Sequence, residues 1–261
     1  MHALVAVDWH IVWLRVFHPG NVFARALWAT IYISVVSQAL GVALGLVAAL
    51  MRVSRLAPLR WLSGIYVWIF RGTPLLVQIF VIYTTFNTPA FSFGKVWSVP
   101  AEATTGILAL SINEGAYMRE IIRAGIDSID KGQMEAAKSL GMRYGLAMRR
   151  IILPQAARVI VPPLGNEFNN MLKNTALLFT IGVFELFAFS EQNYSQFFIA
   201  DYFLAIAVWY LMLTTVWTFI QAYIERRLAV SERGDALSFR ERLELAWNPV
   251  GTLTRMGRGP S

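Results

Sequence analysis

Five long apolar stretches constrain the fold of this chain more than any other feature of its sequence. A helix that crosses the hydrocarbon core of a bilayer needs about 20 consecutive, predominantly apolar residues. Inside a bilayer every backbone polar group needs an internal partner, and helices of this length provide one for each residue. The sequence therefore predicts an all-α integral membrane protein with about five transmembrane helices, over residues 22–51, 61–86, 101–122, 155–187 and 202–224.

The composition agrees with a membrane protein and excludes several kinds of active site. Hydrophobic residues make up 56% of the chain and charged residues only 15%, whereas roughly a quarter of the residues of a soluble domain are charged. The chain has no cysteine, and its three histidines (His2, His10 and His18) all lie within the first twenty residues. Disulfides, thiolate chemistry and a histidine triad or metal centre in the main body are therefore excluded.

Three segments follow from this pattern. Residues 1–21 contain a tryptophan-rich apolar run that is too short to span a bilayer, which predicts an N-terminal interfacial helix. Residues 22–228 form the predicted transmembrane domain. The tail, residues 229–261, is charged and punctuated by Gly and Pro, so we expect a short helix at about 237–247 followed by disorder.

The basic residues predict the orientation of the chain and account for its net charge of +7 without nucleic acid. Arg and Lys gather in the first and third connections and in the tail. The second connection carries only Lys95, and the fourth, at about 188–201, has no Lys or Arg. Because cytoplasmic loops carry the excess of basic residues, the N-terminus is expected outside and the tail in the cytoplasm.

Small and helix-breaking residues indicate how two of the apolar stretches are used. In the first, Gly41, Gly45 and Ala49 recur every fourth residue, a stripe that allows close helix packing. In the second, Gly72 and Pro74 interrupt the helical geometry. We therefore expect the second stretch to break into two pieces at this point.

The segment 130–154 is predicted to be a two-helix loop between the third and fourth stretches. Asp130, with Gln133 three residues later, suits a capping box at the start of a first helix. Gly141 is able to adopt the left-handed conformation that ends it. A second helix is expected from about residue 142 to 153, with Pro154 at the start of another.

This loop also matches a known signature. The order is EAA, three residues, Gly, nine residues and then I-x-L-P, carried here by Glu135, Ala136, Ala137, Gly141, Ile151, Leu153 and Pro154. It resembles the EAA loop of the permease subunits of ATP-binding-cassette (ABC) importers. The strings FRGTPLLVQIF and NEGAYMREIIRAG resemble elements of the polar amino-acid branch of that family. From residue types alone, an ordinary basic cytoplasmic loop would be the alternative.

The resemblance implies a permease of the bacterial inner membrane that works by alternating access with several partners. These are a second permease subunit (the same or homologous), two ATPase subunits, an extracytoplasmic substrate-binding protein and a polar amino acid. Because the chain lacks G-x-x-x-x-G-K-[ST], it should carry no cofactor itself, and ATP-Mg would be bound by the ATPases. The residues that would couple to the ATPases are Glu135, Ala136, Ala137, Gly141, Arg143 and Arg149.

A polar face in the fourth apolar stretch is the main candidate for the substrate path. At 100° per residue, six polar residues share an arc of roughly 160°. A charge at this depth costs about 2.5–3.5 kcal/mol, so it normally faces a bundle interior or an aqueous path. Two interpretations remain open, a path lining and a network that only holds helices together. This polar arc comprises Asn166, Glu167, Asn169, Asn170, Lys173 and Asn174.

Two further polar residues extend the list of candidates. Glu114, in the third stretch, is equally compatible with a substrate contact and a packing network, and Gln78, in the second, is a further path candidate. Glu120 and Arg123 are three residues apart on a helix and are expected to pair.

Other functions and substrates also have to be weighed. A membrane-embedded Ser–Lys hydrolase would need a serine near Lys173, and none lies within a turn of it in the sequence. A passive channel is not favoured by the EAA spacing. Within the transport class, another small polar solute is the alternative to an amino acid, and the polar arc would suit a cationic, neutral or acidic zwitterion.

Overall fold

The computed structural model describes residues 7–86, 100–197 and 201–229, and these residues form helices without any β-strand. The all-α prediction is therefore confirmed at the level of fold class. The chain divides into two compact units, Met1–Gln221 and Ala222–Ser261. The described part of the second unit is the end of the last helix, and all the other described helices belong to the first unit. The helix predicted at 237–247 lies outside the described residues.

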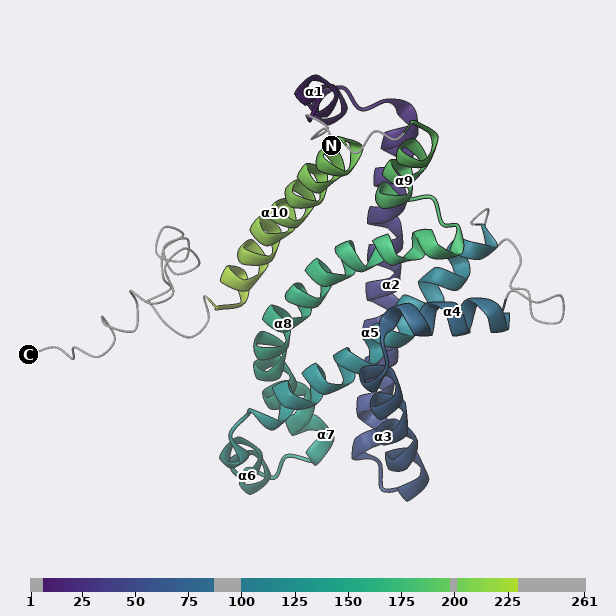
Figure 1. Cartoon of the computed structure of the whole chain (residues 1–261). Helices are drawn as coiled ribbons and strands as arrows, with labels where there is room; N and C mark the ends of the chain where they lie inside the picture. Colours follow the sequence, from purple (N-terminus) through teal and green to yellow (C-terminus); the bar gives the residue numbers. More distant parts are fainter. Residues whose placement is uncertain (1–6, 87–99, 198–200, 230–261) are drawn as a thin grey trace, which may run out of the picture. The chain divides into compact units, whose positions relative to one another are not determined.

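The helices follow one another along the chain as shown in Figure 1. In order they are α1 (Trp9–Phe17), α2 (Asn21–Val53), α3 (Ala57–Gly72), α4 (Leu75–Phe86), α5 (Ala101–Asp127), α6 (Lys131–Ser139), α7 (Tyr144–Ala147), a π-helical turn (Met148–Ile152), α8 (Leu153–Asn174), a 3-10 segment (Thr175–Ile181), α9 (Leu186–Phe197) and α10 (Asp201–Ala229).

Among the described helices, α2 and α10 are each long and apolar enough to cross a membrane. Two bent pairs pass the same test together, α3 with α4 and the run Tyr144–Ile181 with Leu186–Ser195. If each bent pair is one span, the number of spans rises to four. The sequence-based count of about five also included α5.

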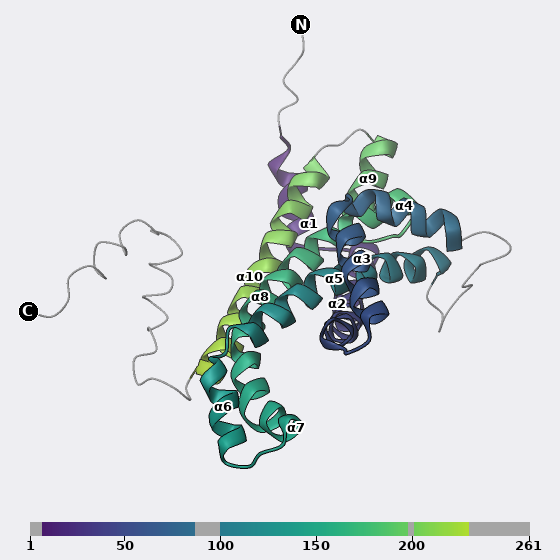
Figure 2. The same ribbon diagram turned by 90° about the horizontal axis from the view of Figure 1, so that it is seen from below.

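The central contact of the fold joins α2 and α5, which cross in Figure 1, whereas Figure 2 looks nearly along the axis of α2. A Cβ atom added to Gly41 would lie 2.5 Å from Cγ of Glu114. One added to Gly45 would lie 2.9 Å from the backbone nitrogen of Arg119. The two backbones approach this closely only because neither glycine has a side chain. The predicted role of this stripe in helix packing is confirmed.

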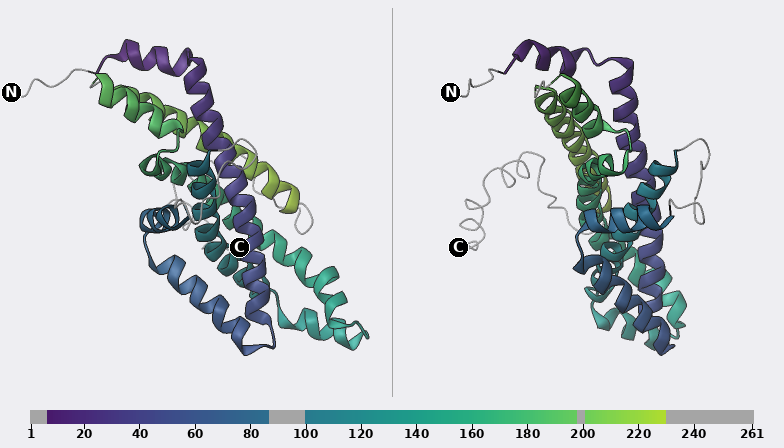
Figure 3. Two further views of the ribbon diagram at one scale, coloured as in Figure 1. Left: turned by 90° about the vertical axis from the view of Figure 1, so that its right-hand side faces the viewer. Right: turned by 45° about the vertical axis from the view of Figure 1, so that its right-hand side comes forward.

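The predicted break in the second apolar stretch is also confirmed. α3 ends at Gly72, and α4 leaves it at a bend of 112°, which is visible in Figure 3. Gln78 holds the bend together, because its Nε2 donates to the carbonyl oxygens of Phe70 (2.9 Å) and Thr73 (3.0 Å) and to the Thr73 hydroxyl (2.8 Å). These bonds satisfy backbone carbonyls that the end of α3 leaves without helical partners.

The N-terminal helix forms as predicted, over Trp9–Phe17, and it is fastened to the start of α10. The backbone N–H of Asp8 donates to Oδ2 of Asp201 at 3.2 Å. Nη2 of Arg15 donates to the hydroxyl of Tyr202 at 3.0 Å, and the Arg15 guanidinium also lies 5.2 Å from the centre of that ring. The exposed Trp9 and Trp13 on its outer face are of the type found at membrane interfaces.

The second helix of the loop 130–154 begins at Tyr144, two residues after the predicted start, and Pro154 lies in the first turn of α8 as predicted. A π-helical turn joins the two helices. In that turn the N–H of Leu153 bonds to the carbonyl of Met148, five residues back. The wider turn carries the helix past Pro154, which has no N–H to donate.

One boundary predicted from the sequence is wrong, because the connection expected at 188–201 contains α9, which begins at Leu186. The 3-10 segment before it ends at Gly182, which has a left-handed φ of 86°. The carboxylate of Glu185 then accepts the N–H of Ala188 at 2.7 Å and caps the new helix. The polypeptide therefore turns by 44° and continues as a helix.

Candidate functional site

The polar arc lies on one face of α8, in its second half. Asn166, Asn170 and Lys173 are exposed, whereas Glu167, Asn169 and Asn174 are partly buried. On the opposite face Met171 and Leu172 are buried. The structure thus brings the six predicted residues together on one side of a helix.

Side chains of α10 hold α8 in the region where Pro162 and Pro163 remove two backbone N–H donors. Nε1 of Trp217 donates to the carbonyl of Gly165 at 2.7 Å. Nε2 of Gln221 donates to the carbonyl of Pro162 and to Oδ1 of Asn166, both at 3.2 Å. These contacts fix the register of α8, and thereby the direction in which the polar arc faces.

One oxygen of the arc is buried without a hydrogen-bond donor among the described residues, namely Oδ1 of Asn169. A buried acceptor left unpaired costs about 1–3 kcal/mol. A donor from a ligand or from another subunit would remove that cost. The neighbouring Glu167 would add negative charge for the same donor.

Glu114 and Gln78 differ from the arc residues because both are buried in helix contacts. Oε1 of Glu114 accepts Nε2 of Gln38 across the α2–α5 contact at 2.9 Å. Oε1 of Gln78 accepts Nδ2 of Asn113 at 2.8 Å, which ties the α3–α4 bend to α5. Of the two interpretations left open for Glu114, these contacts favour the packing network, and they give Gln78 a bracing role.

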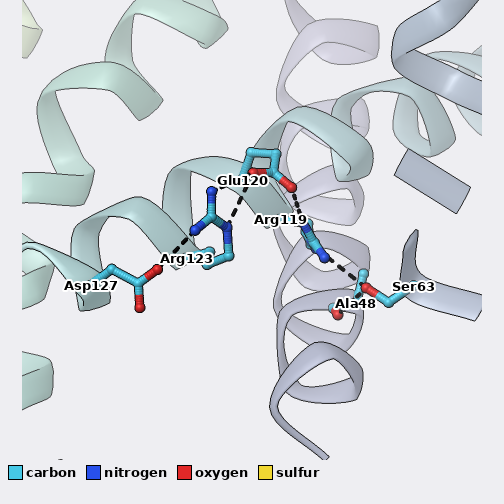
Figure 4. Close-up of polar contacts among 6 residues, drawn as sticks. All are labelled: Ala48, Ser63, Arg119, Glu120, Arg123 and Asp127. Carbon is cyan, nitrogen blue, oxygen red and sulfur yellow. Dashed lines mark hydrogen bonds and ion pairs between the residues drawn. The ribbon is translucent and has the colours of Figure 1, made fainter. Parts of the chain in front are cut away.

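A ladder of charges runs along the second half of α5 (Figure 4). Nη2 of Arg123 pairs with Oε2 of Glu120 at 3.0 Å, as the sequence predicted. Glu120 also pairs with Arg119, and Nη1 of Arg123 reaches Oδ2 of Asp127 at 2.8 Å. Nε of Arg119 continues the ladder to the Ser63 hydroxyl on α3 at 3.3 Å. The link to Ser63 was not predicted, because sequence spacing says nothing about contacts between distant helices.

The loop 130–154 folds into two packed helices, α6 and α7, connected by a tight turn. Oδ1 of Asp130 accepts the N–H of Gly132 at 2.6 Å and caps α6 as predicted. Gly141 has a left-handed φ of 79°. The N–H of Gly141 bonds to the carbonyl of Lys138 (2.9 Å) and that of Met142 to the carbonyl of Ala137 (3.0 Å). This pair of bonds is a Schellman motif, so Gly141 fixes the angle at which α7 leaves α6.

The EAA loop presents an exposed surface of mixed character. Ala137 is buried, and the other predicted coupling residues, Glu135, Ala136, Gly141, Arg143 and Arg149, are exposed. Leu140 is 82% exposed and Tyr144 is 61% exposed, with Leu146 beside them. Large apolar side chains in this setting mark a surface for another protein. The sequence reasoning missed these three residues because it relied on the motif positions alone.

A buried carboxylate that the sequence analysis did not single out is Glu185. It is completely buried and accepts the hydroxyl of Tyr210 at 2.9 Å in addition to capping α9. It therefore joins α9 to α10. Among the described residues, no cluster of three or more His, Cys, Asp or Glu side chains could hold a metal ion.

Comparison with known proteins assigns the family. Residues 41–230 match the family of binding-protein-dependent transport system inner membrane components. The chain belongs to this family. Because its members are transport components, the membrane-enzyme alternative built on Lys173 has no support.

Similar proteins include named amino-acid permeases. An arginine transport system permease protein of Corynebacterium glutamicum is 39% identical over 211 residues, which cover 78% of this chain and 67% of that protein. An L-cystine transport system permease protein of Bacillus subtilis is 39% identical over 227 residues, covering 85% of this chain and 92% of that protein.

Solved structures show the same fold. A crystal structure of an amino acid ABC transporter with histidines matches with a TM-score of 0.70 and 37% identity over 79% of this chain and 94% of the other. An inward-facing methionine ABC transporter matches with a TM-score of 0.66 at 19% identity, over 79% of this chain and 96% of the other, and supports the fold alone. The all-helical fold of this chain thus resembles that of ABC transporter structures.

Proposed function

We propose that this chain is the permease subunit of an ABC importer for polar amino acids and that it forms the translocation path by alternating access. The observation that carries the proposal is the polar arc on α8. It occurs in a chain that is 39% identical to proteins named as arginine and cystine permeases. An apolar helix does not keep six polar residues on one face without a polar partner for them.

The chemistry of the arc suits a zwitterion. Glu167 and the unpaired Oδ1 of Asn169 would accept the hydrogen bonds of an ammonium group. Lys173, which is exposed, would attract a carboxylate. The path would therefore be lined by Asn166, Glu167, Asn169, Asn170, Lys173 and Asn174, with Glu114 and Gln78 bracing the helices behind it.

Energy would enter through the EAA loop. Two ATPase subunits would dock on it, and the exposed Leu140 and Tyr144 supply apolar area for such a contact. Glu135, Ala136, Ala137, Gly141, Arg143 and Arg149 would be the coupling residues. ATP would drive transport only if the ATP-bound partners have different affinities for the outward and inward states.

The remaining parts of the proposal concern topology and assembly. α5 would be a fifth span, with the N-terminus outside and the EAA loop and tail in the cytoplasm of a bacterium. A second permease subunit, identical or homologous, would complete the path, and an extracytoplasmic binding protein would deliver the substrate.

The test is to purify the chain together with its ATPase and binding protein, reconstitute the complex in vesicles and screen amino acids for stimulated ATP hydrolysis. Arginine, glutamine, glutamate and cystine represent the cationic, neutral, acidic and disulfide-linked classes. We expect strong stimulation by one class. Stimulation only by a non-amino-acid solute would assign a different substrate, and ATP binding by the isolated chain would contradict the permease assignment.

A further inference from the structure

A cavity of about 480 Å³ lies where α2 ends and α3 begins, at the junction visible in Figure 3. Arg52 belongs to the last turn of α2, and the other lining residues belong to α3. Those of α3 recur at intervals of three or four residues and therefore share one face of that helix. The cavity is lined by Arg52, Arg60, Trp61, Gly64, Ile65 and Trp68.

The cavity carries positive charge without acidic partners. No Asp or Glu occurs between Asp8 and Glu102, so α2, α3 and α4 contain no carboxylate side chain. The ion pairs of the described residues involve neither Arg52 nor Arg60. Glu120 on the neighbouring α5 is already shared between two other arginines. An unpaired cationic cluster of this kind attracts an anion.

Arg60 is held in position by the turn between the two helices. Its Nη1 donates to the carbonyl oxygens of Ser54 (3.1 Å) and Arg55 (2.9 Å). The guanidinium is therefore held in place beside the cavity that Arg60 lines, and its remaining N–H groups have no hydrogen-bond acceptor among the described residues. A guanidinium fixed in this way is suited to bind a phosphate through two parallel hydrogen bonds.

The other wall of the cavity is apolar and exposed. Trp61 is 72% exposed and Trp68 is 75% exposed, with the exposed Ile65 between them. Tryptophan is enriched where a membrane meets water. Gly64 leaves room between these side chains, since a Cβ atom added there would meet nothing within 4 Å. The site therefore combines a cationic end with an apolar channel.

We propose that this cavity binds one anionic phospholipid, with its phosphate between Arg52 and Arg60 and its acyl chains along Trp61, Ile65 and Trp68. A free anion would leave the tryptophans uncovered, and an uncharged lipid would leave the arginines unpaired. Basic pockets between transmembrane helices are known to bind anionic head groups. The inference needs only the membrane location of the chain and is independent of the transported substrate.

The test uses the full chain in detergent, incubated with phosphatidylglycerol or with phosphatidylcholine, and counts retained lipids by native mass spectrometry. Wild type should retain phosphatidylglycerol in preference to phosphatidylcholine. Arg52→Gln should weaken this binding about fivefold, the effect of one basic residue near an anionic lipid. Arg55→Gln is the matched control, because Arg55 lies three residues after Arg52 and is also exposed but does not line the cavity.

A second variant tests the cavity without changing the charge. Gly64→Leu places a side chain in open space, so the fold should persist while the acyl chain is excluded. Retention of phosphatidylglycerol should fall in this variant as well. Normal retention in Gly64→Leu would overturn the cavity site, even if Arg52→Gln weakens binding, because general surface charge would then account for the lipid. Competition by millimolar inorganic phosphate, or cross-linking that shows a second copy of the chain covering Trp61 and Trp68, would also overturn it.

Discussion

Substitution of Gly141 by valine offers the sharpest test of coupling through the EAA loop. Gly141 has a φ of 79°, a conformation that β-branched residues avoid strongly. Even a residue with a simple Cβ loses about 1–2 kcal/mol there, which corresponds to a roughly 5- to 30-fold change in the population of the native turn. We expect the turn to relax by giving up the Schellman bonds made by Gly141 and Met142, so that the angle between α6 and α7 changes.

The matched control is Gly145→Val in the same loop. An added Cβ atom meets nothing within 4 Å at either glycine, so neither substitution causes a clash. Gly145, however, lies in the helix α7 and does not have a positive φ. Valine there should change stability by less than about 1 kcal/mol. The two variants thus differ in backbone strain and not in crowding or in the side chain introduced.

The assay is substrate-stimulated ATP hydrolysis and uptake by the reconstituted complex. Gly141→Val should insert in the membrane normally but lose most of the stimulation, whereas Gly145→Val should retain it. Wild-type stimulation and uptake in Gly141→Val would show that the geometry of this turn is not the route of coupling. Equal losses in the two variants would point to disturbed docking at this surface instead.

Three further predictions concern the helices of the membrane domain. Glu167→Gln removes the proposed charge-assisted hydrogen bond to the substrate, worth roughly 1.5–3 kcal/mol. Stimulation of ATP hydrolysis by a cationic amino acid should then need about 10- to 100-fold more substrate. Glu191→Gln on α9 serves as the charge-matched control. An unchanged substrate ranking with a destabilised complex would instead assign Glu167 to helix contacts. Gly45→Ala forces a Cβ atom against the backbone of α5 and should destabilise the protein by about 1–3 kcal/mol. The measurement is the midpoint of thermal unfolding in detergent, which should fall. An unchanged midpoint would contradict the close α2–α5 contact. Gln78→Leu removes the donor to the Thr73 carbonyl and one of the two acceptors of Asn113 Nδ2, which keeps its bond to the Phe70 carbonyl. This change should cost about 1–3 kcal/mol, whereas unaltered stability would show that the bend does not depend on this amide.

The features that could be predicted from the sequence are those determined by a few neighbouring residues. Gly72 and Pro74 end a helix for reasons that lie in their own backbones, and the structure breaks there. Gly141 takes the left-handed conformation that its place between two helical runs requires. The amphipathic character of α8 follows from the helical period, so the polar arc was also correctly placed on one face.

The features that could not be predicted depend on contacts between distant parts of the chain. The helix α9 starts where Glu185 caps it, and that carboxylate is buried because Tyr210, 25 residues later, donates to it. The link from Arg119 to Ser63 spans 56 residues. Glu114 shows the same limit, since its residue type allowed both a substrate contact and a packing role, and its burial against Gln38 became visible only in the folded chain.

The continuity of α7 with α8 has a mechanical consequence for the proposed function. A helical run from Tyr144 to Ile181 includes both the EAA loop's second helix and the polar arc, with a π-helical turn joining the two helices that the sequence predicted. From Tyr144 to Glu167 this run spans roughly 35 Å at 1.5 Å per residue. A flexible loop between the two would absorb a displacement at the ATPase-facing end, whereas a continuous helix transmits it. Pro162 and Pro163 remove two N–H donors from this run, and in the same region Trp217 and Gln221 hold the carbonyls of Gly165 and Pro162. If the EAA loop couples to the ATPases as proposed, we expect its displacement to move the polar arc about this point, provided that Gly141 keeps α6 at a fixed angle to the run.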